Sequence, residues 1–185
     1  MSDEILVNIT PQETRVAVVE NGVVQEVIIE RTRKKGLVGN IYKGEISRVL
    51  PGMQAAFVDI GLERGAFLHV SDLSSKDTQR LGTENIDHLL SEHLDIVVQV
   101  IKDPLGTKGA RLTTELSIPS RYTVYMPYSP TCGISQRIES EQERTRLKDC
   151  MDRFQSEFNT GAFIARTAAE CVEEDVLRTD MMFLI

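Results

Sequence analysis

Several features that mark large classes of protein are rare or missing in this sequence. It has no tryptophan, and its three cysteines, Cys132, Cys150 and Cys171, form no CxxC pair, so they indicate neither a disulfide framework nor a zinc site. No stretch approaches the roughly 20 apolar residues of a membrane-spanning helix, and the N-terminus lacks the pattern of a secretory signal. These absences predict a cytoplasmic protein with reduced cysteines and no membrane segment.

Catalytic patterns are scarce too. The carboxylates Asp59, Asp72 and Asp103 have no spacing typical of paired metal ligands, and no Ser, His or Cys residue lies in a nucleophile motif. The sequence therefore predicts neither catalytic residues nor metal ligands in this chain.

The charge balance restricts how the chain could bind nucleic acid. It has 28 acidic and 21 basic residues, a net charge of −7. A protein that wraps nucleic acid without sequence preference is usually basic overall. Any such contact must therefore be local and should grip a short segment of the strand.

A five-stranded barrel is predicted over residues 37–118. Pro51-Gly52 is a turn pair in which Gly supplies the conformation that a Cβ resists. A long polar segment over 74–92, with a short helix near Ile86 to Leu90, precedes the fourth strand, and a glycine-rich turn over 103–109 precedes the fifth. This order is typical of an OB-type Greek-key barrel. The strands are expected at 41–49, 55–60, 65–68, 95–102 and 110–116.

A three-stranded meander is predicted before the barrel, over residues 1–36. Asn21-Gly22 is the strongest short signal for a hairpin, because both residues tolerate positive φ. A meander of about thirty residues buries too little apolar surface to be stable alone. The basic linker over 31–36 is either a solvated connector or a phosphate contact. The strands are expected at 5–9, 15–19 and 23–30.

An α/β unit is predicted over residues 119–185, beginning where Pro119 ends the barrel. Ser140 and Glu143 form an S-x-x-E capping box, in which each side chain satisfies a backbone donor of the other. A second helix ends on an apolar run, as expected for a helix that is truncated or leans on a partner. The chain is thus predicted to be α+β and mainly β. Helices are expected at 140–158 and 172–185, and strands at 122–126 and 161–166.

Two groups of residues are candidates for binding nucleic acid. Phe57 and Phe67 lie in adjacent predicted strands, with Lys43, Arg48, Lys102 and Arg111 nearby and Lys108 on the glycine-rich turn. Ring faces stack bases while cations follow the phosphates. The alternatives are that both rings belong to the barrel core and that Lys108 is a surface lysine without a role.

The second group is Arg166-Thr167, after an apolar strand. A guanidinium and a hydroxyl side by side can both donate to one phosphate, and Arg137 could approach from the preceding segment. The alternative is an arginine that caps strand carbonyls and a threonine in a turn.

Four motifs carry a resemblance to a known family. They are GNIYKGEISRVLPGMQAAFVDIGLERGAFLHVSDL from Gly39, KDPLGTKGARLTTELSIPSRY from Lys102, and ISQRIES from Ile134 followed by FIARTAAE from Phe163. In these segments the sequence is similar to the amino-terminal region of the bacterial ribonuclease E/G family. IPSRY and VLPGMQAAFVDIG are more similar to the ribonuclease G branch than to ribonuclease E.

The resemblance implies a division into three parts. Residues 1–36 resemble the first strands of an RNase H-like subdomain, which is incomplete here. Residues 37–118 resemble an S1-type OB-fold domain inserted into it, and 119–185 resemble a 5′-sensor. Members of the family are metal-dependent endoribonucleases. They cut single-stranded AU-rich RNA, favour a 5′-monophosphate end, and act in rRNA maturation and mRNA decay.

The resemblance also assigns site residues. For RNA binding, the resemblance implies Phe57, Phe67 and Lys108. For the 5′-phosphate, it implies Arg166 and Thr167, backbone atoms near Ser120 and Val124, and a role for Arg137. Members closer to ribonuclease E have glycine where Ser120 stands.

The active site and the contacts between protomers are expected in another part of the family protein. Its magnesium-binding aspartates and the zinc-linking cysteine pair of its homo-oligomer are implied on a DNase I-like domain beyond Ile185. This chain alone is therefore predicted to bind single-stranded RNA with a 5′-monophosphate, without a cofactor and without cleaving it. The alternatives are a stand-alone S1-type RNA-binding module and a protein-interaction domain that uses the barrel as a scaffold.

Overall fold

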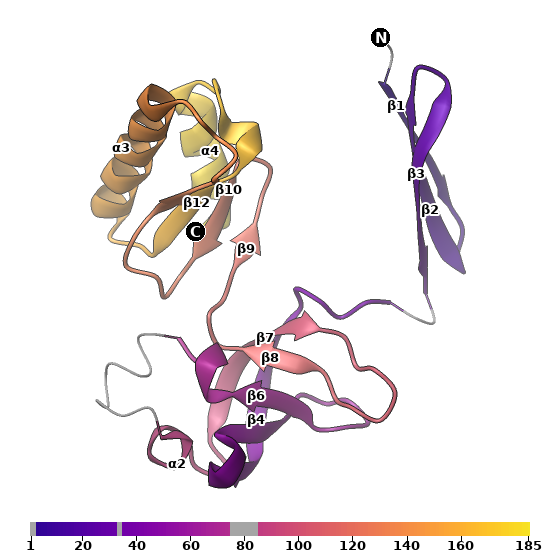
Figure 1. Ribbon diagram of the computed structural model, residues 1–185, viewed down its shortest axis with the longest axis vertical. Coiled ribbons are helices and arrows are strands. Elements are labelled where there is room, and N and C mark those ends of the chain that lie inside the picture. Colours follow the sequence, from indigo (N-terminus) through magenta and orange to yellow (C-terminus); the bar gives the residue numbers. More distant parts are fainter. Residues whose placement is uncertain (1–2, 33–34, 75–84) are drawn as a thin grey trace. The chain divides into compact units, whose positions relative to one another are not determined.

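The computed structural model describes residues 3–32, 35–74 and 85–185 (Figure 1). The chain divides into two compact units, residues 1–37 and 38–185. Most of the polar segment predicted over 74–92, and part of the basic linker predicted over 31–36, lie outside the described residues. The three-part division drawn from the sequence stays a prediction.

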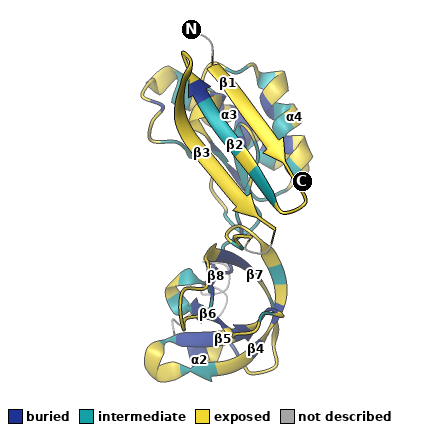
Figure 2. Cartoon of the chain, turned by 90° about the vertical axis from the view of Figure 1, so that its right-hand side faces the viewer, coloured by how far each residue is buried: buried dark blue, intermediate teal, exposed yellow. Residues whose placement is uncertain are grey.

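The first unit is an antiparallel sheet in the order β1-β2-β3. Asn21 and Gly22 connect the second hairpin with φ of 50° and 78°, which confirms the expected turn. Val19 is the one described residue of these strands that is buried, and Figure 2 shows β1 and β3 in the colour of exposed residues. The sheet has almost no core of its own, as the sequence predicted. Its strands are β1 (Asp3–Ile9), β2 (Glu13–Glu20) and β3 (Val23–Arg31).

The second unit begins with a closed barrel in the order β4-β5-β6-β8-β7. Its third and fifth strands, β6 and β8, pair in parallel, and the other neighbours pair antiparallel. This arrangement confirms the predicted OB-type barrel. A short helix, α2 (Ile86–Leu89), precedes the fourth strand as expected. The strands are β4 (Ile41–Leu50), β5 (Ala55–Asp59), β6 (Ala66–His69), β7 (Asp95–Lys102) and β8 (Arg111–Thr113).

The turn after β4 differs from the prediction. Pro51–Met53 forms one turn of 3₁₀-helix, η1, and the left-handed residue is Gln54, with φ of 48°, rather than Gly52. The Gln54 side chain supports this conformation, because its amide donates to the Pro51 carbonyl at 2.8 Å and its Oε1 accepts from the Ile86 backbone at 3.1 Å. A bonded side chain thus takes the role that the sequence assigned to glycine.

The rest of the second unit is a four-stranded sheet in the order β11-β12-β10-β9, with α3 packed on β12 and α4 on β10. Its core includes the fully buried side chains of Leu147, Phe154, Phe163 and Met181. The elements are β9 (Ile118–Pro119), β10 (Thr123–Met126), β11 (Gly133–Ile134), α3 (Glu141–Phe158), β12 (Ala162–Ala165), the 3₁₀ turn η3 (Thr167–Ala169) and α4 (Glu174–Leu184).

Pro119 lies in β9, an edge strand, where the missing N–H of proline is tolerated, and the boundary expected at this residue stays a prediction. The start of α3 differs from the sequence reading. Ser140 caps α3 by accepting from the Glu143 N–H at 3.4 Å, but the Glu143 carboxylate accepts from Arg146 and from the Cys171 N–H. These bonds, that from Arg146 above all, lower the pKa of Glu143. The reciprocal half of the capping box is replaced by a hydrogen bond that links α3 to the segment before α4.

Gly44 in β4 offers a test of barrel packing. A Cβ at this position would lie 2.7 Å from Val58 Cγ1 and 2.8 Å from the Asp59 carbonyl oxygen. Gly44→Ala should therefore lower the free energy of unfolding by about 1–3 kcal/mol. Gly52→Ala is the matched control, because a Cβ there meets nothing within 4 Å. Chemical denaturation measures both, and equal stability of the two variants would contradict the packing described.

Candidate nucleic-acid interface

Three aromatic side chains form a row on the outside of the barrel. Phe57 of β5 lies opposite Phe67 of β6, with ring centroids 6.1 Å apart at 69°. His69, two residues further along β6, stacks on Phe67 at 6.4 Å and 26°. Phe57 is 36% exposed, whereas its neighbour Val58 is fully buried. The rings therefore line the outer surface, and neither phenylalanine belongs to the buried core.

His69 is a member of this row that the sequence reading missed. The signal was available, because residues two apart on a strand share a face and Phe67 and His69 are two apart. The His69 Nδ1 accepts from the Ser71 N–H at 3.2 Å, which fixes the orientation of the ring. The row therefore offers three stacking surfaces rather than two.

A fixed positive charge lies beside the rings. Arg111 of β8 pairs with Phe67 across the parallel ladder. Its Nε donates to Asp72 Oδ2 at 2.9 Å and its Nη2 to Asp72 Oδ1 at 3.2 Å. The hydrogen bond and charge of Asp72 raise the pKa of Arg111. This bidentate geometry holds the guanidinium in one orientation next to Phe67.

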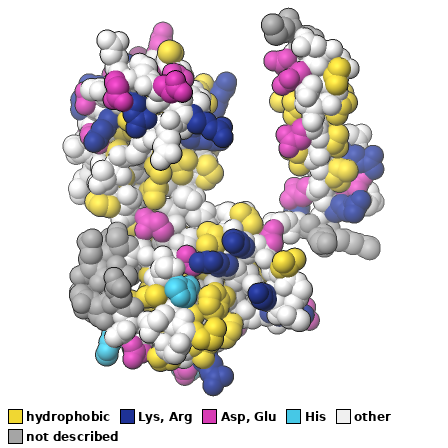
Figure 3. All heavy atoms as spheres, viewed as in Figure 1, with side chains coloured by type: hydrophobic (Ala, Val, Ile, Leu, Met, Phe, Trp, Pro, Cys, Tyr) yellow, Lys and Arg dark blue, Asp and Glu magenta, His cyan; other side chains and the backbone are white. Residues whose placement is uncertain are grey.

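Other cations of the barrel differ in their freedom. Arg48 lies opposite Phe57 in the β4–β5 ladder, and directly opposed residues share a face of the sheet. Lys43 is paired with Asp95 at 2.6 Å, so its charge is partly neutralised. Figure 3 shows Lys and Arg side chains beside hydrophobic ones on one face of this barrel. A local basic surface therefore exists on a chain with a negative net charge.

The turn that carries Lys108 is anchored at its base. A Cβ on Gly109 would lie 2.1 Å from the carbonyl oxygen of Gly65, the residue before β6. Only glycine permits this approach of the two backbones. Arg64 also donates a hydrogen bond to the Gly106 carbonyl within the turn. Lys108 is exposed, so it extends from a turn that is fixed against the strand of Phe67.

A second candidate site lies at one edge of the four-stranded sheet. β11 and β12 are parallel, so both end at this edge, and antiparallel β10 begins there. The Ser135 N–H donates to the Ala165 carbonyl and the Arg166 N–H to the Tyr122 carbonyl, both at 2.8 Å. Three segments that are distant in sequence therefore converge at the same place.

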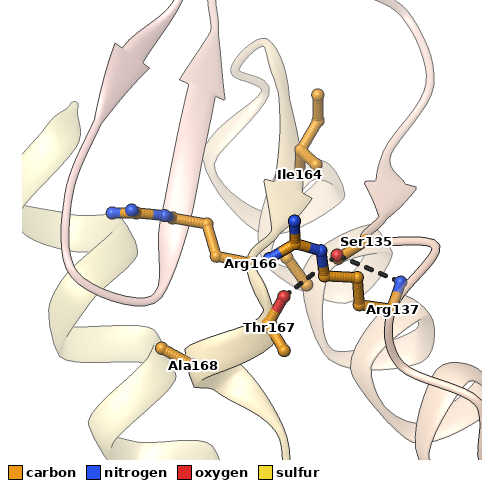
Figure 4. A pocket seen from close by; sticks show the side chains of 7 residues that line it. Ser135, Arg137, Ile164, Arg166, Thr167 and Ala168 are labelled. Carbon is orange, nitrogen blue, oxygen red and sulfur yellow. Dashed lines mark hydrogen bonds between the residues drawn. The ribbon is translucent and has the colours of Figure 1, made fainter.

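A pocket of about 540 Å³ opens at this edge (Figure 4). The Ser135 hydroxyl lies 3.2 Å from the Thr167 hydroxyl and accepts from the Arg137 N–H at 3.4 Å. Arg144 of α3 donates to the carbonyls of Ser135 and Ile138, each at 3.0 Å, and so shapes the loop of Arg137. The hydroxyls of Ser135 and Thr167 and the guanidinium of Arg137 can donate hydrogen bonds to an anion such as phosphate. The pocket is lined by Ser135, Arg137, Ile164, Ala165, Arg166, Thr167 and Ala168.

The five residues predicted for the phosphate are not all brought together. Arg137 extends its guanidinium over Thr167, whereas Arg166 points away toward the turn before β10 (Figure 4). There Arg166 donates to the Ser120 carbonyl, which is the capping contact that the sequence left open as an alternative. Val124 lies in β10 between Pro119 and Ile164. Neither Ser120 nor Val124 lines the pocket, and a phosphate role for all five stays a prediction.

Other chemistry finds little support in the described part of the chain. Residues 3–32, 35–74 and 85–185 contain no group of three or more His, Cys, Asp or Glu that could hold a metal. Burial raises the pKa of the Cys132 thiol to about 11, so it stays protonated at neutral pH and is a poor nucleophile. None of the described helices is both long enough and apolar enough to cross a membrane.

Comparison with protein families gives a match for each of the two regions that carry a candidate site. Residues 37–114 match the S1 RNA binding domain, and these residues include the whole aromatic row and Lys108. Residues 117–185 match the ribonuclease E/G family, and these include the pocket at the sheet edge. The chain thus contains an S1 domain followed by a segment specific to that family.

Whole-chain comparison agrees. The chain is similar to ribonuclease G of Haemophilus influenzae, with 54% identity over 98% of this chain and 38% of that protein, and to ribonuclease G of Escherichia coli K12, with 53% identity over 100% and 39%. It is 42% identical to ribonuclease E of Nostoc over 76% of this chain and 20% of that protein. The chain spans about two fifths of the length of the ribonuclease G relatives. It belongs to the ribonuclease E/G family.

Proposed function

We propose that this chain is the RNA-binding and 5′-end-sensing part of a bacterial endoribonuclease of the ribonuclease G type. The observation that carries the proposal is the row formed by Phe57, Phe67 and His69 on the outside of an S1 barrel. Exposed rings on adjacent strands, with cations close by, are what single-stranded nucleic acid requires.

The barrel grips the strand through stacking and charge. Bases stack on the faces of Phe57 and Phe67 because every base has a π-face, which makes the contact tolerant of sequence. Arg111 and Lys108 follow the phosphates beside the rings, the first fixed by Asp72 and the second on its anchored turn. The negative net charge of the chain limits this grip to a short segment of RNA.

The pocket at the sheet edge receives the 5′-monophosphate. Arg137, Thr167 and Ser135 already surround the space with donors. Arg166 joins them when its guanidinium leaves the Ser120 carbonyl for the phosphate, because a guanidinium can form two parallel hydrogen bonds to a charged phosphate but only one to this carbonyl. Binding a phosphate at a distance from the scissile bond positions the strand and so raises the rate of cleavage.

The activity of the whole protein is part of the same proposal. It is cleavage of single-stranded AU-rich RNA during rRNA maturation and mRNA decay in the bacterial cytoplasm, by a homo-oligomer joined through zinc. Magnesium would supply an activated water there. The described residues of this chain offer no cluster of metal ligands, so we assign none of them to magnesium or zinc.

The stacking row gives a first prediction. Phe57→Ala or Phe67→Ala should raise the Kd for single-stranded RNA by roughly 5- to 150-fold, since one stacked base contributes about 1–3 kcal/mol. Fluorescence anisotropy with a short AU-rich RNA measures the change. Phe183→Ala is the control, because that ring is 84% exposed on α4, outside the barrel. Unchanged affinity in a stably folded Phe67→Ala variant would remove this ring from the RNA site.

The phosphate pocket gives a second prediction. Arg166→Ala should remove the preference for 5′-monophosphate over 5′-hydroxyl RNA, with a loss of about 10- to 150-fold in affinity for the phosphorylated strand, because it deletes a charge-assisted bond. Arg153→Ala is the control, since Arg153 forms an exposed pair with Glu174. The two RNAs are compared in one binding assay, and a preference that survives the substitution counts against this use of the pocket.

A third prediction concerns catalysis by the chain alone. The described residues lack a cluster of metal ligands, so the chain should bind RNA without magnesium-dependent cleavage. Incubation with labelled single-stranded RNA, with magnesium and with EDTA, tests this. Cleavage that copurifies with the chain and is abolished by Phe67→Ala would show that the active site lies within these residues.

A further inference from the structure

One carboxylate of α4 reaches across to the turn that joins β9 and β10. Asp180 Oδ2 accepts from the Thr123 N–H at 3.0 Å, from the Thr123 hydroxyl at 2.7 Å, and from the Ser120 hydroxyl. Thr123 is 1% exposed, so its donors have no access to bulk water. Asp180 therefore satisfies every donor that the two ends of this turn direct toward the helix.

The same turn is bonded to the phosphate site on its other side. The Ser120 N–H donates to the Thr123 carbonyl at 2.8 Å, which closes the turn. The Ser120 carbonyl in turn accepts from the Arg166 guanidinium. Ser120 is thus bonded to Asp180 through its side chain and to Arg166 through its backbone.

The chemistry of these bonds requires a carboxylate. An ionised carboxylate only accepts hydrogen bonds, whereas the amide of asparagine has two donors of its own. Three donors converge on one oxygen of Asp180, and bonds to a charged acceptor are the stronger kind. An amide could not accept equally well from all three. The turn would then shift, and the Ser120 carbonyl would shift with it.

We propose that Asp180 is a positioning residue of the 5′-phosphate site. It fixes the Ser120–Thr123 turn, and the Ser120 carbonyl then holds the Arg166 guanidinium in its resting place outside the pocket, which it must leave to reach the phosphate. Asp180 does not line the pocket, so its negative charge acts on the turn rather than on the phosphate. This inference rests on the proposed function of Arg166.

Asp180→Asn tests the proposal with little change in shape. The ratio of the Kd values for 5′-hydroxyl and 5′-monophosphate RNA should rise by about three- to tenfold, because the bond that competes with the phosphate for Arg166 is weakened by about the net contribution of one ordinary hydrogen bond. Asp175→Asn makes the same change of charge on an exposed residue of the same helix and should leave the ratio unchanged. An equal rise in both variants would assign the effect to net charge, and a fall in Asp180→Asn would also overturn the proposal.

A double variant separates positioning from a purely structural role. In an Arg166→Ala background, Asp180→Asn should cause no rise in the ratio, because residues that act through one another are not additive. A rise of the same size as in the single variant would show that Asp180 does not act through Arg166. If Asp180→Asn does not fold, Ser120→Ala removes one of the three donors and makes the same comparison.

The outcomes also separate this inference from the proposed function. If Arg166→Ala keeps the preference for the monophosphate, the proposed 5′-sensing is wrong and the inference falls with it. If Arg166→Ala removes the preference while folded Asp180→Asn leaves it unchanged, the inference alone is overturned. Thermal unfolding of each variant shows whether the fold is intact.

Discussion

Closure of the barrel is the constraint on which the exposed aromatic row depends. The parallel pairing of β6 with β8 brings the third strand beside the fifth. Once the barrel is closed, alternate residues of every strand face inward, and the fully buried Val58 and Leu68 take those places. Phe57 and Phe67 must then face outward, because each is one residue away. The same pairing places Arg111 beside Phe67, so rings and charge arise from one register.

In the four-stranded sheet, strand direction rather than barrel closure brings distant residues together. Parallel β11 and β12 end at one edge, and antiparallel β10 begins there. Loops that are some thirty residues apart, at Ser135 and Thr167, become neighbours 3.2 Å apart. Two helices then hold the loops at this edge through side-chain hydrogen bonds, α3 through Arg144 and α4 through Asp180. The pocket is thus a product of topology, and the helices hold its parts in place.

Much of this could be predicted from the sequence. Alternating and apolar runs located the strands of the barrel, and Ser140 located the start of α3. The side chain of Gln54 and the alternative partners of Glu143 could not be predicted, because both depend on residues that are distant in sequence, Ile86 and Cys171. For the same reason Arg166 could be named but not oriented. Its direction depends on a carbonyl 46 residues away, which no local pattern reveals.

The contact between Gly65 and Gly109 has a consequence for how this protein can vary. At the base of the turn over 103–109, the Gly65 backbone leaves no room for a side chain on Gly109. At the tip of this turn, a Cβ on Gly106 would meet nothing within 4 Å. Sequence change is therefore tolerated at the tip, within the limits of its positive φ, and resisted at the base. Related chains could therefore change the tip of the turn that carries Lys108 without rebuilding the barrel beneath it.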